Sequence, residues 1–156
     1  MDYKILLHEN IIKQDLSLFV DIIYNNFIEL NQNPKLMHNK DKILESLQSP
    51  NAVLIIAMNK KTMAGFVMAE IIELQDRRQV LFISYIYVAQ SMRSNGLGGE
   101  LMTIAENFAL NNKCIGVMLI FDTHNSNLVR FYERRGYMLD INLRRYERHD
   151  VFYKVV

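Results

Sequence analysis

The sequence predicts a mixed α/β fold (α+β class): a mostly antiparallel sheet of six or seven strands, flanked by about four helices, with one central parallel β-α-β unit. Two uninterrupted apolar runs, residues 80–88 and 115–121, are joined by an amphipathic helical pattern. This arrangement is typical of parallel strands buried on both faces. The other apolar stretches are separated by short polar turns, as in antiparallel strands.

Composition narrows the class of protein. The chain has 156 residues, 50% of them hydrophobic, and a net charge of +1, so we expect a single domain over residues 1–156 with a well-formed core. There is no Lys/Arg run and no acidic block, and we expect no nucleic-acid partner. The only cysteine, Cys114, favours a reducing, cytoplasmic compartment. No apolar stretch reaches the ~20 residues of a membrane span.

The first half of the chain predicts a strand, two helices and a hairpin. Apolar side chains spaced 3.6 residues apart indicate the helices, and polar turns bound the strands. The expected order is a strand at 3–8, a helix at 16–27, a polar connection at 31–39, a helix at 43–47, and hairpin strands at 52–58 and 63–74.

A glycine-rich loop connects the apolar run 80–88 to the central helix. Leu97, Leu101, Ile104, Ala105 and Phe108 recur along one face of that helix. The helix therefore begins inside the glycine cluster. A helix N-terminus offers free N–H groups and a positive dipole end, and glycines let a phosphate approach the backbone. The loop is thus a candidate anion site.

Three phosphate-binding patterns compete for this loop. A Walker P-loop ends in Gly-Lys-Ser/Thr, but Gly98 is followed by Gly99 and Glu100. A dinucleotide fingerprint needs a third glycine where Leu101 stands. The pattern Arg/Gln-x-x-Gly-x-Gly/Ala is matched in full by the six residues that begin at Arg93.

A second motif lies in the last third of the chain. Asn125 is followed seven residues later by Tyr132, and then by Gly136 and Tyr137. The apolar spacing predicts a short helix at 126–134 that Asn125 or Ser126 caps and that ends at Gly136. Two final strands are expected at 137–142 and 151–156, on either side of the Arg-rich turn 144–150.

Together, the two motifs and the element order resemble the GCN5-related N-acetyltransferase (GNAT) family. The resemblance covers nearly the whole chain and is strongest over residues 82–137. It implies an acetyl-CoA-dependent enzyme that transfers an acetyl group directly to a primary amine. The acceptor would be a protein N-terminus, a lysine or a small-molecule amine. Neither a metal ion nor a covalent enzyme intermediate is expected.

The resemblance also implies roles for particular residues. The backbones of Tyr87 and Val88 would pair with the pantetheine arm, and the Val88 N–H would polarise the thioester carbonyl. Asn125 would hold the pantetheine, and Tyr132 would lie near the sulfur and protonate the departing thiolate. The pyrophosphate would bind the loop residues Arg93, Ser94, Asn95, Gly96, Leu97, Gly98 and Gly99.

The sequence departs from the family at the general base. Many members carry a glutamate on one of the two central strands, but residues 80–88 and 115–121 contain no carboxylate. Glu70, Asp122, His124 or an ordered water remain as candidates. An imidazole ordinarily titrates closest to neutral pH, which favours His124.

The acceptor site is expected between the first two helices and the turn between the last two strands. Candidate lining residues are Tyr24, Phe27, Tyr85 and the turn 144–150. The predicted partners are acetyl-CoA and an amine acceptor, and the chain is expected to be a monomer or a homodimer. Two rival functions stay open: a non-catalytic acyl-CoA-binding module and a dinucleotide-binding domain.

Overall fold

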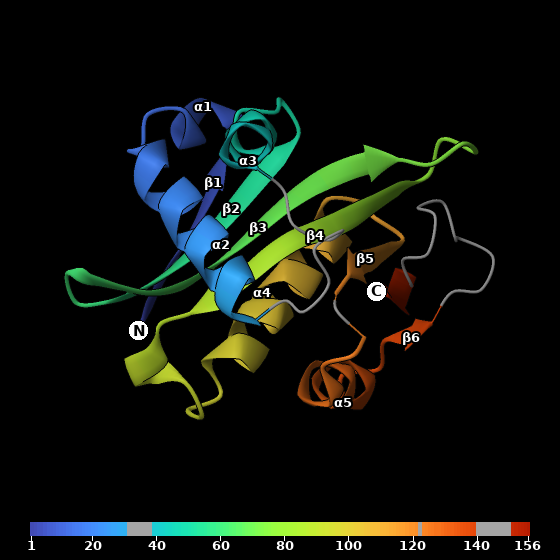
Figure 1. Ribbon diagram of the computed structural model, residues 1–156. Coiled ribbons are helices and arrows are strands. Elements are labelled where there is room, and N and C mark those ends of the chain that lie inside the picture. Colours follow the sequence, from blue (N-terminus) through green and yellow to red (C-terminus); the bar gives the residue numbers. More distant parts are fainter. Residues whose placement is uncertain (31–38, 122, 140–150) are drawn as a thin grey trace.

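A mixed sheet forms the centre of the structure (Figure 1). The computed structural model describes residues 1–30, 39–121, 123–139 and 151–156, with side chains 27–30 left out. In this part of the chain the sheet has seven strands in the order β1-β2-β3-β4-β5-β7-β6. Figure 1 shows α2 in front of the sheet and α4 behind it. The predicted fold class is therefore confirmed.

The elements of the first half follow the predicted order. The short helix α1 was not predicted, because four residues carry no readable periodicity. The predicted connection 31–39 lies outside the described residues except for Asn39, whose side chain caps α3 by accepting from the Lys42 N–H at 2.8 Å. The elements are β1 (Asp2–Leu7), α1 (His8–Ile11), α2 (Leu16–Leu30), α3 (Lys40–Leu47), β2 (Ala52–Asn59) and β3 (Thr62–Glu73).

The second half contains the predicted parallel unit. The helix predicted at 126–134 has those bounds, and the 3₁₀ helix η2 was not predicted. The turn 144–150 and residues 140–142 of the predicted strand lie outside the described residues. The elements are β4 (Gln79–Val88), η2 (Gln90–Met92), α4 (Leu97–Asn111), β5 (Gly116–Ile120), α5 (Ser126–Arg134), β6 (Met138–Leu139) and β7 (Val151–Val155).

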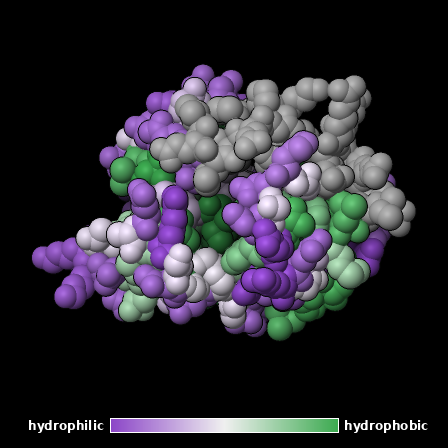
Figure 2. Space-filling model, turned by 60° about the horizontal axis from the view of Figure 1, so that its bottom comes forward, coloured by the Kyte–Doolittle hydropathy of each residue, from purple (hydrophilic) through white to green (hydrophobic). Residues whose placement is uncertain are grey.

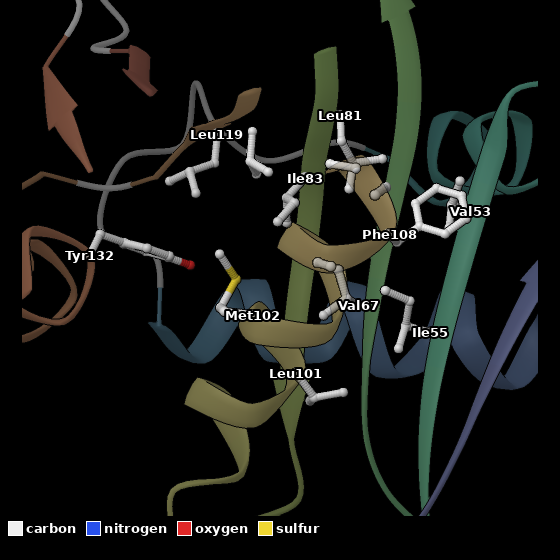
Figure 3. Close-up of a cluster of buried hydrophobic side chains, with 14 of the residues drawn as sticks. Val53, Ile55, Val67, Leu81, Ile83, Leu101, Met102, Phe108, Leu119 and Tyr132 are labelled. Atoms are coloured by element: carbon white, nitrogen blue, oxygen red, sulfur yellow. The ribbon is translucent and has the colours of Figure 1, made fainter. Parts of the chain in front are cut away.

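Two hydrophobic clusters sandwich the sheet. On one face, α4 and α5 pack against β2–β5, and this cluster contains Leu101, Ala105, Tyr132 and Cys114 (Figure 3). On the other face, α2 and α3 cover β2–β4, with Phe19 stacked edge-on against Phe66. Burial raises the pKa of the Cys114 thiol, as expected for a cysteine that serves as a small hydrophobic core residue. No helix in the described ranges is long and apolar enough to cross a membrane.

A β-bulge at Ser84 divides β4 into two parts. Met68 pairs with Tyr85, whereas the next residue of β3, Ala69, pairs with Ile83, so Ser84 is an extra residue on β4. Pairing of β4 with β5 is confined to residues 81–83 of β4. From the bulge to the end of β4, residues 84–88 have no partner on β5, and residues 85–88 pair with β3. We call this segment the open half of β4.

Candidate active site

The glycine loop, residues 93–99, leads from the open half of β4 into α4. Gly96 is the N-cap of α4 and has φ +80°, a left-handed conformation that glycine adopts without strain. Ser94 is also left-handed, with φ +68°. The first helical hydrogen bond runs from the Glu100 N–H to the Gly96 carbonyl at 3.1 Å. The preceding N–H groups, those of Leu97, Gly98 and Gly99, are left available for a ligand.

Arg93 ties the loop back to the strand that precedes it. Its Nε donates to the Val88 carbonyl at 3.0 Å. Arg93 and the loop residues Ser94 and Asn95 are exposed. The predicted phosphate ligand thus also fixes the path of the loop, and its other guanidinium nitrogens stay at the surface.

Gly98 is the place where the two sequence motifs meet. A Cβ atom on Gly98 would lie 3.7 Å from Phe131 Cζ and 3.8 Å from Val88 Cγ2. The first turn of α4, the end of β4 and the inner side of α5 therefore converge there. In Figure 2, which views this end of the molecule, hydrophobic surface lies recessed between hydrophilic projections.

Asn125 caps the N-terminus of α5. Its Oδ1 accepts from the N–H groups of Asn127 at 3.2 Å and Leu128 at 3.4 Å. The capping role considered from the sequence is therefore present. It occupies the oxygen of Asn125, and the amide nitrogen is the group that remains for a pantetheine carbonyl. The neighbouring His124 is exposed.

Tyr132 projects from α5 into the core and is 4% exposed. Its ring lies 4.8 Å from that of Phe121 and 5.7 Å from that of Tyr137. Figure 3 shows its hydroxyl pointing toward Met102 of α4. Burial raises the pKa of Tyr132, and the nearby Arg135 charge offsets a part of that rise. The phenol is thus held protonated.

The two faces of the open half of β4 differ. Tyr85 and Tyr87 point toward α2 and join Tyr24 in the cluster on that side, whereas Val88 packs on the α4 side. Tyr85 is 7% exposed, and burial raises its pKa. Two predicted acceptor-site residues, Tyr24 and Tyr85, therefore share one face, while the side chain of Phe27 and the turn 144–150 lie outside the described residues.

Of the predicted general bases, Glu70 is far from the glycine loop. Val88 pairs with Gly65, five residues before Glu70 on β3, a separation of roughly 17 Å by strand rise. The Glu70 carboxylate accepts instead from the Ser49 hydroxyl at 2.7 Å. Glu70 therefore lies away from Val88 and the glycine loop, although Met68, two residues before it on β3, pairs with Tyr85. Asp122 lies outside the described residues.

Side chains that the sequence analysis did not select join α4 to other elements. Tyr3 of β1 donates to the carboxylate of Glu100 in the first turn of α4. Glu106, further along α4, accepts from Arg135 and Lys154. Local sequence patterns could not reveal these pairs, because the partners lie far apart in the chain and periodicity reports burial, not partners.

A pocket lies next to the glycine loop. It has a volume of about 580 Å³, lies between the β2–β3 hairpin and η2, and ends at Met92, before the glycine loop. Among the described residues, no group of three or more His, Cys, Asp or Glu side chains is placed to hold a metal ion.

Comparison with known proteins gives a family match and a partial sequence relative. A family model described as the Acetyltransferase (GNAT) family matches residues 20–137. The acetyltransferase Atu2258 of Agrobacterium fabrum is 33% identical over 57 residues, which make up 36% of this chain and 40% of that protein. The match thus spans less than half of this relative.

Solved structures share the fold at low sequence identity. NAA60 of Arabidopsis thaliana in complex with acetyl-CoA has a TM-score of 0.69 and 13% identity, with 99% of this chain and 98% of that chain covered. The aminoglycoside acetyltransferase meta-AAC0020 from an uncultured soil metagenomic sample, in complex with sisomicin, has a TM-score of 0.64 and 13% identity, with 85% of each chain covered.

Proposed function

Because the chain belongs to the Acetyltransferase (GNAT) family, we propose that it is an acetyl-CoA-dependent N-acetyltransferase that acts on a primary amine. One observation carries this proposal. A Cβ atom on Gly98, in the first turn of α4, would lie 3.7 Å from Phe131 of α5 and 3.8 Å from Val88 at the end of β4, beside a strand segment that β5 leaves unpaired. This geometry offers an anion site next to free strand backbone.

The cofactor fits this place from its phosphates to its thioester. The pyrophosphate binds the N–H groups at the start of α4, where the helix dipole is positive. The pantetheine arm, with its two amides, pairs with the backbone of Tyr87 and Val88 as an added strand. The Nδ2 group of Asn125 donates to a pantetheine carbonyl, since its Oδ1 already caps α5.

The reaction is an acyl transfer without an enzyme-bound intermediate. The neutral amine attacks the acetyl carbonyl carbon and forms a C–N bond. The negative charge that develops on the carbonyl oxygen is stabilised by the Val88 N–H. The C–S bond then breaks, the electron pair leaves with the CoA sulfur, and the amine nitrogen loses a proton to yield the amide.

Tyr132 acts on the departing sulfur. Its pKa is raised by burial, whereas an unperturbed thiol has a pKa of about 8.5. Complete proton transfer from this phenol to the thiolate is therefore uphill, and hydrogen-bond donation is favoured. The hydroxyl stabilises the thiolate as the C–S bond breaks.

The base that deprotonates the amine is His124 or an ordered water. His124 is exposed and directly precedes the N-cap of α5, where it reaches solvent. The distance of Glu70 from Val88 along the strands argues against Glu70 in this role. A water relay places no demand on a carboxylate, which fits the absence of Asp and Glu from residues 80–88 and 115–121.

A calorimetric titration with acetyl-CoA tests the proposal, with NAD as the control. We expect saturable binding of acetyl-CoA and none of NAD. Release of CoA thiol is then measured with a panel of N-terminal peptides, lysine peptides and aminoglycosides. Failure of the folded protein to bind acetyl-CoA would overturn the proposal. Binding without thiol release from any amine would favour the rival function, a non-catalytic acyl-CoA-binding module.

A further inference from the structure

Four side chains, which we call the clasp, join α4 to the end of α5 and to β7. They are Glu106, Arg135, Tyr137 and Lys154. The Glu106 carboxylate accepts from Arg135 Nη2 at 3.2 Å and from the Tyr137 hydroxyl at 3.3 Å through Oε1, and from Lys154 Nζ at 3.0 Å through Oε2. One carboxylate on α4 thus binds groups from two other parts of the chain, the end of α5 and β7.

The clasp is more sheltered than the other ion pairs of the described residues. The side chain of Glu106 is 11% exposed and that of Arg135 is 21% exposed. The exposed fractions in the pair Lys40–Asp21 are 53% and 57%. Sheltered charges are less screened by solvent, and removal of one partner leaves the other uncompensated. Loss of the Glu106–Arg135 ion pair should therefore affect the structure more than loss of the exposed pair Lys40–Asp21.

One branch of the clasp reaches the glycine loop. Arg135 Nη2 also donates to Thr103 Oγ1 at 2.9 Å, and that hydroxyl donates to the Gly99 carbonyl at 3.0 Å. A Cβ atom on Gly99 would lie 3.3 Å from Arg135 Nη1. Arg135 thus lies along the first turns of α4, directly behind the proposed phosphate site.

The other branch reaches the reaction centre. The Tyr137 hydroxyl is held by Glu106, and the Tyr137 ring packs edge-on against the ring of Tyr132. Helix α5 packs against the rest of the molecule through its side chains, and these contacts set its position. Within the described residues, the clasp supplies the hydrogen bonds that connect α5 and the residues just after it to α4.

We propose that Glu106 and Arg135 are positioning residues for the reaction. Their ion pair fixes the distance between α4 and α5, and thereby places Asn125 and Tyr132 opposite the glycine loop. This inference rests on the proposed function, since it concerns the same acetyl-CoA site. Both residues act through the elements that they join.

Acetyl-CoA affinity of clasp variants tests this role. Glu106→Gln and Arg135→Met remove the ion pair while they nearly preserve side-chain volume. We expect each to weaken acetyl-CoA binding about tenfold, the effect typical of groups within one network. The double variant should bind no more weakly than the weaker single variant, because both changes break the same pair. Asp76→Asn, which breaks the exposed pair with Arg78 at 2.6 Å, is the matched control and should leave the affinity unchanged.

Hydrogen exchange separates positioning from general stability. In Glu106→Gln, amides of residues 126–137 should exchange faster than in the wild type, while amides of β2 keep their protection. If Glu106→Gln fails to fold, Arg135→Met, which removes the other member of the ion pair, replaces it in both measurements.

The outcomes distinguish this inference from the proposed function. If wild-type protein does not bind acetyl-CoA, the function itself is wrong. If the wild type binds and both clasp variants bind within about twofold of it, the ion pair does not position the site. A lower melting temperature with unchanged affinity has the same meaning, because the clasp would then be a structural tie only.

Discussion

Three tyrosine side chains of this protein, those of Tyr85, Tyr132 and Tyr137, are buried. Burial raises the pKa of Tyr85, Tyr132 and Tyr137 above the ordinary phenol value. These side chains therefore stay protonated at physiological pH and act as hydrogen-bond donors. Their burial thus favours hydrogen-bond donation over a phenolate base, in line with the donor role proposed for Tyr132.

Substitution of Tyr132 by Phe should reduce turnover more than cofactor affinity. The change removes one hydroxyl and leaves the buried ring, so the packing against Phe121 is kept. Loss of a donor to a developing negative charge typically costs about 10²-fold or more in kcat. Steady-state kinetics and calorimetry with acetyl-CoA give the two quantities. Equal losses in both would remove the leaving-group role.

Tyr3 should make stability depend on alkaline pH. Burial, followed by the hydrogen bond and the charge of Glu100, raises its pKa from 10.0 to about 12 in the folded state. The stabilisation is thus fully present below the unfolded pKa, and it is lost as the pH rises through about 12. As the pH rises from about 9 to about 12, a range that includes the unperturbed phenol pKa, we expect Tyr3→Phe to lose less stability than the wild type. Urea unfolding at several pH values measures this, and parallel curves for the two proteins would contradict it.

Among the elements, the glycine loop depends most on backbone conformation. Gly96 has a positive φ, and a Cβ there would meet no atom within 4 Å. The space around a side chain at this position is therefore open. The positive φ and a ligand bound there are the two factors that restrict a substitution. Asn and Asp tolerate left-handed conformations better than other residues with side chains. A comparison of the Asn and Asp variants at this position therefore separates the effect of charge from that of backbone conformation.

Gly96→Asp should weaken acetyl-CoA binding, whereas Gly96→Asn should have a small effect. The carboxylate would face the pyrophosphate, and a loss of about tenfold corresponds to ~1.4 kcal/mol. High salt should reduce the difference between the variants, because it screens exposed charges. Calorimetry at two salt concentrations measures both. Equal affinities for Asp and Asn would mean that the phosphates bind elsewhere.

The strand pair β3–β4 should tolerate no side chain at Gly65. A Cβ there would lie 2.5 Å from the Tyr87 carbonyl oxygen, which is a backbone atom and cannot move alone. Gly65→Ala should therefore cost about 1–3 kcal/mol of stability. Gly98→Ala is the control for stability, since its methyl would make only contacts of 3.7 Å or more. Urea midpoints of the two variants should differ, and similar midpoints would show that β3 and β4 can separate freely.

For the molecule as a whole, ligand binding should appear as thermal stabilisation. A ligand at 100 times its Kd stabilises the folded state by about 2.7 kcal/mol, which raises Tm by about 5–10 °C for a domain of this size. We expect this shift with acetyl-CoA and none with NAD. Differential scanning fluorimetry measures both, and an equal response to the two ligands would point to a nucleotide site of the dinucleotide type.

The fold was largely predictable because most of its helices and strands follow from the local spacing of apolar residues. The amphipathic spacing predicted α4 and α5, and the two continuous apolar runs predicted the parallel pair of β4 and β5. Helix α1 and η2 are too short to carry a pattern. The cap at Asn125 was also predictable, since capping is a local property.

The links between elements were not predictable from one sequence. Glu106 and Lys154 are 48 residues apart, and Tyr3 and Glu100 are 97 apart. Nothing in the local pattern around Glu106 distinguishes it from a solvated helix carboxylate. The bulge at Ser84 was equally hidden, because an apolar strand that is buried on both faces shows no alternation that an extra residue could interrupt.

The extra residue at Ser84 reverses the alternation of side chains along β4. Before the bulge, the odd-numbered residues Leu81 and Ile83 face α4. After it, the even-numbered residues Ile86 and Val88 face α4. The odd-numbered Tyr85 and Tyr87 then face α2. A regular strand of the same sequence, with Ser84 kept but no bulge, would hold one parity throughout and exchange the two faces of the open half. The tyrosines would then crowd the cofactor, and Val88 would face the acceptor. A single extra residue thus turns Tyr85 and Tyr87 to the face of the proposed acceptor site and leaves Val88 on the α4 face.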